Sequence, residues 1–181
     1  MKQQIEEILR RHKKKKITDQ SLKASAVLIP LFYSQGQYHV LLTERSDDVN
    51  FHKGQVCFPG GTREPSDSSL LQTALREAEE EIGLKAKDVE VLGEFDDSLT
   101  FTSDYVISPF VAIMPYPYPL KADSREIKEI FSVPLSFFMD EANFERDSGA
   151  YKYGKHVIWG ATARIIKQFV DLLKSESGAS Q

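Results

Sequence analysis

The sequence lacks the features that several large protein classes require. Its single cysteine, Cys57, excludes an intramolecular disulfide and a multi-cysteine zinc site, so we expect a reducing compartment such as the cytoplasm. Its longest apolar stretches, residues 26–33 and 105–114, are far shorter than the roughly 20 residues that a membrane helix requires. The first 16 residues have no apolar core followed by a small-residue cleavage site. We therefore expect neither a membrane span nor a secretory signal.

The chain also lacks the excess of positive charge that typifies proteins that bind phosphate backbones. It has 23 lysines and arginines against 27 aspartates and glutamates, for a net charge of −4. This balance argues against nucleic acid as the main partner. A basic run over residues 10–16 is the exception, and we interpret it as the solvated end of a helix, with RNA-linked hydrolysis as a minor alternative.

The length of 181 residues indicates one domain with short extensions. We expect an amphipathic basic helix within residues 1–20, because Ile5, Ile8 and Leu9 fall on one side of it; this helix packs on the domain or on a partner. Residues 21–175 form the domain itself, with 41% hydrophobic residues in the whole chain, and residues 176–181 form a frayed tail.

Short β-prone runs alternate with a few helical segments along the domain. The predicted strands cover residues 26–33 and 38–43, joined by a turn at 34–37, then 55–58, 89–95, 105–114 and 129–133, with two short strands within 143–156. The predicted helices cover residues 69–82, capped by Ser69 and Gly83, and 161–173. Several connections are too short for crossovers, so we expect an α/β fold in which a mixed sheet carries helices on its faces.

The helix over residues 69–82 carries an unusual group of carboxylates. At about 100° per residue, Glu77, Glu80 and Glu81 share one side, whereas Glu79 points elsewhere. The side expected to face the core comprises Leu71, Leu75, Ala78 and Ile82. Like charges three and four residues apart destabilise a helix, so a positive partner should accompany them, unless this is only a solvated acidic face.

A cation is the partner that the surrounding sequence favours. The segment Phe58-Pro59-Gly60-Gly61 precedes the helix, and its glycines allow backbone atoms to approach a ligand closely. Oxygen ligands from three glutamates and a backbone carbonyl suit a hard cation such as Mg²⁺ or Mn²⁺, and such a cation suits a phosphate-bearing substrate.

The segment GGTREPSDSSLLQTALREAEEEIGL resembles the Nudix box, G-x5-E-x7-R-E-U-x-E-E-x-G-U, where U is aliphatic or small. The positions that match in its second half are Arg76, Glu77, Ala78, Glu80, Glu81, Gly83 and Leu84. The first half departs by a one-residue insertion and by Asp67 in place of glutamate, which leaves Asp67 as a helix N-cap or as part of the loop. The resemblance implies the Nudix fold, a mixed β-sheet sandwiched between helices in α/β/α layers.

The preceding segment, LLTERSDDVNFHKGQVCFPGG, resembles the signature L-L-T-x-R-S-x3-R-x3-G-x3-F-P-G-G of the coenzyme A diphosphatases. The matching positions are Leu41, Leu42, Thr43, Arg45, Ser46, Gly54, Phe58, Pro59, Gly60 and Gly61. The sequence departs at Asn50, where the signature often has arginine. The resemblance implies cleavage of the diphosphate of coenzyme A or its thioesters to 3′,5′-ADP and 4′-phosphopantetheine. ADP-ribose or NADH as substrate, or a nucleotide-binding module without hydrolysis, are the alternatives.

The resemblance also implies roles for individual residues. The implied metal ligands, for Mg²⁺ or Mn²⁺, are Glu77, Glu80, Glu81 and the carbonyl of Gly61. The implied catalytic residues are Glu80 or Glu77 as general base, Arg76 to orient Glu77, and Glu129 or Glu126 as alternative bases from a downstream loop, with Glu129 preferred of the two. The residues implied in substrate binding are Arg45, Ser46, Lys53, Gly54 and Gly60. Family members often pair, so a homodimer is a further expectation.

Overall fold

A central strand, β1 (Lys23–Ser34), organises the protein in the computed structural model, which describes residues 1–181 except 20, 47–52, 101–103 and 179–181. β1 pairs in antiparallel fashion with β2 (Gln37–Arg45) and β4 (Gly60–Thr62), and in parallel with β7 (Tyr105–Ile113). Residues 28–32 are all buried, as expected for a strand covered on both faces. The sheet is therefore mixed, as the short connections predict.

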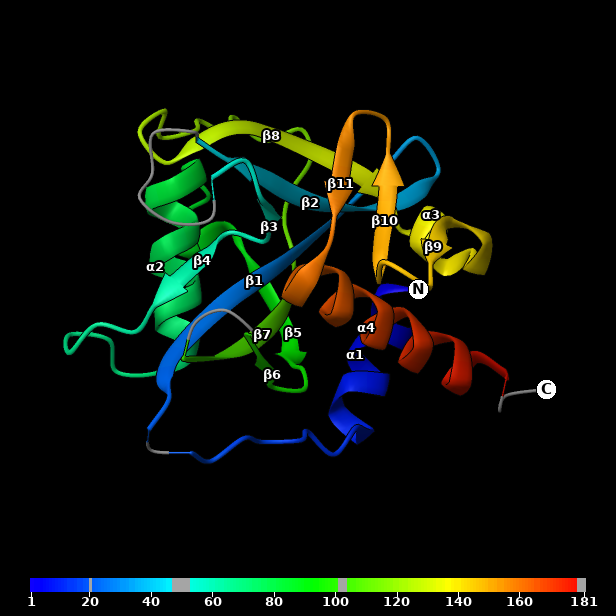
Figure 1. Ribbon diagram of the computed structural model, residues 1–181, viewed down its shortest axis with the longest axis horizontal. Helices are drawn as coiled ribbons and strands as arrows, with labels where there is room; N and C mark the ends of the chain where they lie inside the picture. The colour runs from blue at the N-terminus through cyan, green and yellow to red at the C-terminus, as the bar shows by residue number, and fades with distance from the viewer. Residues whose placement is uncertain (20, 47–52, 101–103, 179–181) are drawn as a thin grey trace.

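Further strands extend this sheet on both sides of β1. β3 (Val56–Cys57) and β8 (Ile127–Pro134) pair with β2, whereas β5 (Glu90–Glu94) and β6 (Ser98–Leu99) pair with β7. A smaller antiparallel sheet contains β9 (Phe144–Glu145), β10 (Ala150–Tyr153) and β11 (His156–Ile158). The β10–β11 hairpin stands beside the larger sheet, next to β3 and β8 (Figure 1).

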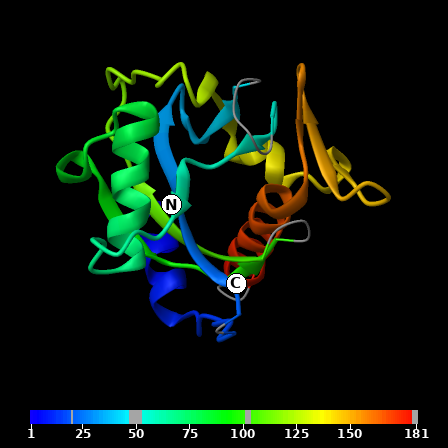
Figure 2. The same ribbon diagram turned by 60° about the vertical axis from the view of Figure 1, so that its left-hand side comes forward.

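Helices cover both faces of the larger sheet. The helix α2 (Leu70–Ile82) packs on one face, and α1 (Lys2–Arg11) and α4 (Gly160–Gly178) pack on the other, so that α2 and α4 lie on opposite sides of β1 (Figure 2). The short α3 (Leu135–Met139) lies with α4, and single 3₁₀ turns occupy Ala86–Asp88 and Glu141–Asn143. The predicted α/β/α sandwich is confirmed. Within the described residues, no helix combines the length and the apolar character needed to cross a membrane.

The N-terminal helix packs on the domain itself. Ile5, Ile8 and Leu9 of α1 are buried in the same apolar cluster as Phe169 of α4. The helix ends at Arg11 and is therefore shorter than the predicted range of 1–20, and the segment that follows it is bound by the domain. Asp96 accepts a hydrogen bond from the backbone N–H of Lys15 at 2.8 Å. The charged run that follows α1 is thus attached to the domain.

The helix α2 has the predicted ends, and all four residues predicted for its inner face contact the apolar core on that side of the sheet. Ser69 caps its N-terminus by accepting a hydrogen bond from the N–H of Gln72, and Gly83 ends it in the left-handed conformation at φ 70°. The fully buried apolar residues are Ala74, Ala78 and Ile82, and Leu71 and Leu75 pack against them while remaining half-buried. Two alanines on the inner side allow the helix to lie close to β1, and this rotates the leucines toward the edge of the interface.

Three other features differ from the sequence-based prediction. The sequence does not predict strands β4 and β6, since β4 is Gly60-Gly61-Thr62 and glycine has low strand propensity. The turn-rich segment 143–156 and the two residues beyond it hold three short strands, where the sequence predicts two. The last helix continues to Gly178, beyond the predicted end at residue 173. Pairing with a neighbour, which local sequence does not reveal, defines the short strands.

Candidate active site

Two glycines of β4 bring the backbone against the acidic face of α2. A Cβ atom at Gly60, where φ is 155°, would lie 2.3 Å from the carbonyl oxygen of Ala26. A Cβ atom at Gly61 would lie 2.5 Å from Oε1 of Glu77. Only glycine allows β4 to pair with β1 and at the same time to approach the Glu77 carboxylate this closely.

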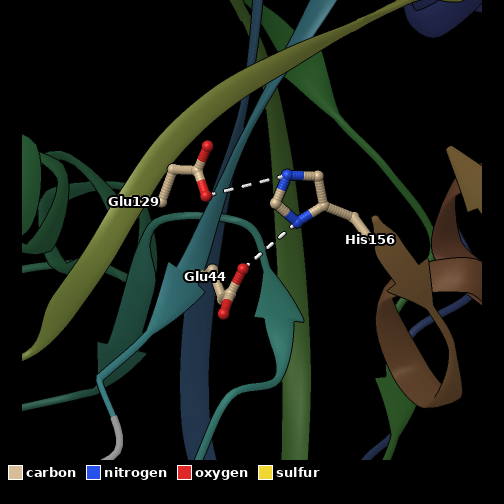
Figure 3. A group of neighbouring side chains, drawn as sticks. All are labelled: Glu44, Glu129 and His156. Atoms are coloured by element: carbon tan, nitrogen blue, oxygen red, sulfur yellow. Dashed lines mark ion pairs between the residues drawn. The ribbon is translucent and has the colours of Figure 1, made fainter. Parts of the chain in front are cut away.

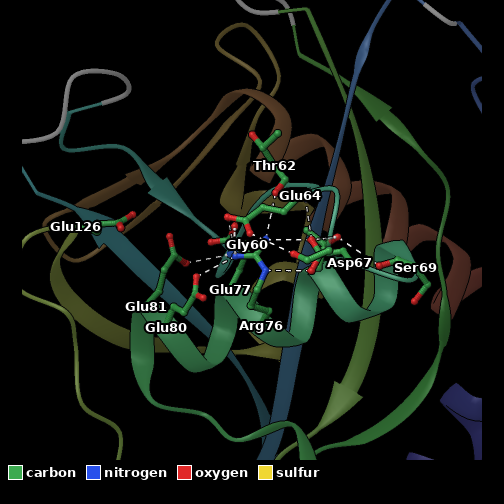
Figure 4. A network of polar contacts seen from close by, with 12 residues as sticks. Gly60, Thr62, Glu64, Asp67, Ser69, Arg76, Glu77, Glu80, Glu81 and Glu126 are labelled. Atoms are coloured by element: carbon green, nitrogen blue, oxygen red, sulfur yellow. Dashed lines mark hydrogen bonds and ion pairs between the residues drawn. The ribbon is translucent and has the colours of Figure 1, made fainter.

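Arg76 is the centre of the polar network on this side of α2 (Figure 4). Its Nη1 atom lies 3.0 Å from Oε1 of Glu77 and 2.9 Å from Oε2 of Glu80. Its Nη2 atom donates to the carbonyl oxygen of Thr62 in β4 at 3.2 Å. One guanidinium therefore holds two of the three expected metal ligands and ties them to the glycine strand.

Asp67 holds Arg76 from the other side. Its two carboxylate oxygens accept hydrogen bonds from Nε and Nη2 of Arg76, both at 3.1 Å. It also accepts from the N–H of Glu64 at 2.9 Å and from the hydroxyl of Thr73 at 2.9 Å. The bonds from Arg76, followed by the bond from Glu64, lower the pKa of Asp67 far below its ordinary range. Asp67 thus acts as the anchor of Arg76, and Ser69 provides the N-cap.

Glu81 is the most deeply buried of the three glutamates, with a side chain only 2% exposed. Its Oε2 atom accepts a hydrogen bond from the N–H of Gly60 at 3.0 Å, and its Oε1 atom lies 3.5 Å from Nη1 of Arg45. Loss of solvation raises the pKa of Glu81 to about 8, although these two partners oppose the shift. A buried carboxyl of this kind gains a strong partner when a cation is bound beside it.

Glu77 and Glu80 differ from Glu81 in exposure. The Glu77 side chain is 16% exposed, and its burial raises its pKa despite the neighbouring Arg76. The Glu80 side chain is 59% exposed and stays in contact with Arg76. The acidic face therefore runs from a buried carboxyl at Glu81 to a solvent-facing one at Glu80.

Arg45, at the end of β2, joins the upstream segment to the acidic helix. Besides Glu81, its guanidinium contacts Glu126, whose Oε2 atom lies 3.9 Å from Nη2 of Arg45. Glu126 precedes β8, and its charge contributes to the raised pKa values of Glu77 and Glu81. Glu126, and not Glu129, is therefore the downstream carboxylate that the fold places beside the acidic helix.

The other predicted substrate-binding residues lie near Arg45. The N–H of Ser46, which is buried, donates to the carbonyl oxygen of Glu126 at 2.7 Å. Gly54 adopts φ 64° in a turn, and its N–H donates to the carbonyl oxygen of Arg45 at 3.2 Å. Lys53 is exposed in the same turn. Asn50, the departure from the signature, lies outside the described residues.

Glu129 lies on the opposite face of the sheet from the acidic helix. It pairs across the strands with Glu44, and its carboxylate lies 2.6 Å from Nζ of Lys155, which lowers its pKa. Successive residues of a strand point to opposite faces, so Arg45 points toward α2 while Glu44 and Glu129 point away from it. The structure does not bring Glu129 together with Glu77, Glu80 and Glu81.

The residues of the acidic face suit a divalent cation. The three carboxylates and the Gly61 carbonyl offer only oxygen atoms as metal ligands, and this is the ligand set that hard cations prefer. The Gly61 backbone adjoins the Glu77 carboxylate so closely that a Cβ atom would collide with it. Two of the carboxyls, Glu77 and Glu81, carry raised pKa values because they are buried next to like charges.

Comparisons with known proteins agree with this geometry. The NUDIX domain family matches residues 22–150. The chain is 37% identical over 164 residues to an uncharacterized Nudix hydrolase NudL of Photorhabdus laumondii, with 85% of this chain and 86% of that protein covered.

Solved structures share the fold at lower identity. An Ap4A hydrolase of C. elegans, in a binary complex, superposes with a TM-score of 0.58 at 15% identity, covering 87% of this chain and 99% of that chain. The NUDIX domain of Shewanella oneidensis NrtR, in complex with ADP ribose, gives 0.52 at 23% identity, covering 72% and 82%. The family match over residues 22–150 and the relative at 37% identity show that the chain belongs to the Nudix hydrolase family, whose enzymes act on nucleoside diphosphate derivatives and generally need divalent metal ions.

Proposed function

We propose that this enzyme hydrolyses the diphosphate of coenzyme A or its thioesters to 3′,5′-ADP and 4′-phosphopantetheine. The observation that carries the proposal is the position of Arg45, which belongs to the coenzyme A signature. Its guanidinium lies 3.5 Å from Glu81 of the Nudix box and reaches Glu126 as well. A planar guanidinium beside the acidic face is suited to bind a phosphate group with two hydrogen bonds.

Glu77, Glu80, Glu81 and the carbonyl of Gly61 are the residues that would hold Mg²⁺ or Mn²⁺. When bound, such an ion neutralises the diphosphate and lowers the pKa of an attacking water. Arg76 keeps the carboxylates of Glu77 and Glu80 in place through its contacts at 3.0 and 2.9 Å. Asp67 in turn fixes Arg76, so both residues act by positioning.

Glu80 is our preferred proton acceptor, with Glu77 as the alternative. Its carboxylate is the most exposed of the three, at 59%, and can therefore meet a water molecule entering from solvent. Glu129 has no part in this proposal, since it lies across the sheet. Glu126, whose side chain is 50% exposed beside Arg45, is the downstream carboxylate that can take part.

A small nucleotide is the partner that this site favours, and we expect the enzyme to work in the cytoplasm.

The basic run over residues 10–16 offers less support for the RNA-linked alternative than its composition suggests. Nζ of Lys14 lies 3.0 Å from both Glu94 and Asp97, and its side chain is only 14% exposed. The charge of Lys14 is thus already paired within the domain.

The expected homodimer can be checked by light scattering of the purified protein.

A substrate panel tests the proposal. The 181-residue protein is incubated with Mg²⁺ or Mn²⁺ and, in parallel, with coenzyme A, dephospho-coenzyme A, ADP-ribose and NADH, and the products are separated by chromatography. We expect release of 3′,5′-ADP from coenzyme A and weaker turnover of the substrate that lacks the 3′-phosphate. Intact coenzyme A beside cleaved ADP-ribose or NADH would contradict the coenzyme A assignment but keep the hydrolase. Tight metal-dependent binding without any product would support a non-hydrolytic module.

A further inference from the structure

A second group of ionisable side chains lies on the sheet face opposite the acidic helix. We call Glu44, Glu129 and His156 the His156 cluster (Figure 3). Glu44 on β2 and Glu129 on β8 are direct cross-strand partners, and His156 comes from β11 of the smaller sheet. The proposed hydrolysis uses none of the three.

The imidazole of His156 lies between the two carboxylates. Its Nδ1 atom is 3.2 Å from Oε2 of Glu44, and its Nε2 atom is 3.8 Å from Oε2 of Glu129. The side chains of His156 and Glu44 are 7% and 13% exposed, and that of Glu129 is 34% exposed. The ring stacks on Phe131 with centroids 3.7 Å apart and an interplanar angle of 6°, so its orientation is determined by packing.

Two carboxylates lie opposite each other in this cluster, and one ring nitrogen of His156 beside them has no hydrogen-bond partner among the described residues. Like charges directly opposite each other on antiparallel strands are destabilising, so Glu44 and Glu129 favour a positively charged partner between them. The Nδ1 atom is fully buried and makes no hydrogen bond of acceptable geometry in the described structure, although Glu44 is near. A cation among the three residues would contact both carboxylates and give this ring nitrogen a partner.

We propose that the His156 cluster binds a divalent transition metal, with Zn²⁺ as the best-suited ion. One oxygen from each glutamate and one nitrogen of His156 all lie within 4.8 Å of one another. An imidazole nitrogen with two carboxylates is a donor set that suits Zn²⁺ better than Mg²⁺, which prefers oxygen alone. The site thus differs in chemistry from the all-oxygen acidic face of α2.

Two lysines compete with the metal for the same carboxylates. Nζ of Lys128 lies 2.7 Å from Oε1 of Glu44, and Nζ of Lys155 lies 2.6 Å from Oε2 of Glu129. Their side chains are 50% and 70% exposed, so each can leave its carboxylate for solvent at little energetic cost. The oxygen of Glu44 that faces His156 is not the one that contacts Lys128.

Metal binding here would connect the two sheets. His156 belongs to the β10–β11 hairpin, whereas Glu44 and Glu129 belong to the larger sheet. A bound ion stabilises the state that holds all its ligands in place, according to the concentration and affinity of the ion. We therefore expect Zn²⁺ to strengthen the attachment of this hairpin.

Titration calorimetry with Zn²⁺ alone tests the site. The 181-residue chain carries Glu77→Gln and Glu81→Gln to suppress binding at the acidic helix, and His156→Gln is added in a second protein. We expect one Zn²⁺ per chain in the first protein and an affinity at least about tenfold weaker in the second. Co²⁺ substituted for Zn²⁺ gives an independent readout through its visible absorption, which should disappear with His156→Gln.

Two further variants keep the test decisive if His156→Gln does not fold. Glu44→Gln should weaken Zn²⁺ binding, whereas Lys155→Ala should strengthen it by removing a competing charge. Absence of Zn²⁺ binding in the parent protein, or unchanged affinity in both His156→Gln and Glu44→Gln, would overturn the proposal. Neither result depends on hydrolysis, so the proposed coenzyme A activity can fail or succeed separately.

Discussion

Two groups of carboxylates lie on opposite faces of one sheet, and they differ in what accompanies them. On the α2 side, Glu77 and Glu81 are buried beside Arg45, Arg76 and backbone atoms of β4. On the other side, Glu44 and Glu129 accompany an imidazole and two exposed lysines. In the first group, two guanidinium groups contact the carboxylates. This combination of negative and positive groups suits the binding of a cation together with a phosphate.

The difference between the groups begins with two adjacent residues. Glu44 and Arg45 follow each other at the end of β2, and their side chains point to opposite faces of the sheet. One carries an acceptor to the His156 cluster, and the other carries a guanidinium to Glu81. A single strand therefore supplies both sites without mixing their chemistry.

The largest effect in this comparison is expected from Glu80→Gln. The variant keeps the shape of the side chain but removes the charge, so we expect kcat to fall by about 10²–10³ with the fold unchanged. The matched control is Glu79→Gln, because Glu79 is exposed on the same helix and points away from the side that Glu77, Glu80 and Glu81 share. Steady-state kinetics with circular dichroism measures both variants; equal activities would contradict the assignment of Glu80.

A smaller loss of turnover is expected when the contact between Asp67 and Arg76 is weakened. Asp67→Asn removes the charge that accepts from Nε and Nη2 of Arg76, and we expect kcat to fall by about 10–100-fold with little change in KM. Glu64→Gln is the control, since Glu64 is exposed and its carboxylate lies 3.9 Å from Nη1 of Arg76. If Asp67→Asn is as active as Glu64→Gln, Asp67 does not position the site.

The burial of Glu81 predicts a pH-dependent stability. Its pKa is raised from 4.5 to about 8, so its contribution to the free energy of unfolding is greatest below pH 4.5 and declines as the pH rises toward 8. In metal-free buffer, Glu81→Gln should therefore gain stability relative to the wild type, by up to about 1.4 kcal/mol per pH unit across this range. Urea unfolding at pH 5 and pH 8.5 measures this difference. A constant difference between the two proteins at both pH values would contradict it.

The smallest effect on turnover is expected from the opposite face. His156→Gln should leave kcat in saturating Mg²⁺ within about twofold of the wild type, because the sheet separates His156 from the acidic helix. With Glu77→Gln and Glu81→Gln added, the same substitution is expected to weaken Zn²⁺ binding by at least about tenfold, so one substitution tests the two groups separately. A fall in kcat similar to that of Glu80→Gln would show that the faces are coupled.

The sequence alone predicts the elements whose signal is local. The ends of α2 follow from Ser69 and Gly83, and the β1–β2 hairpin follows from the turn at Gln35-Gly36, where both residues have positive φ. The helical period by itself places Glu77, Glu80 and Glu81 on one side of α2. These features depend on residues within one or two turns of each other.

Other assignments required contacts between distant segments. The sequence favours Glu129 over Glu126, but pairing of β8 with β2 brings Glu126 beside Arg45 and turns Glu129 to the other face. Asp67 departs from the Nudix motif, yet it anchors Arg76. The sequence does hold a signal for Asp67, because this carboxylate lies in the loop nine residues before Arg76 of the acidic helix.

Local sequence determined the helix caps, the hairpin and the grouping of the glutamates, because backbone preferences and helical period act over a few residues. Tertiary structure decided which carboxylates share a site, because strand register and the alternation of side chains determine the face on which each one lies. It also decided which of them are buried, and burial raises the pKa values of Glu77 and Glu81. Their chemistry thus depends on segments that are far apart in the chain.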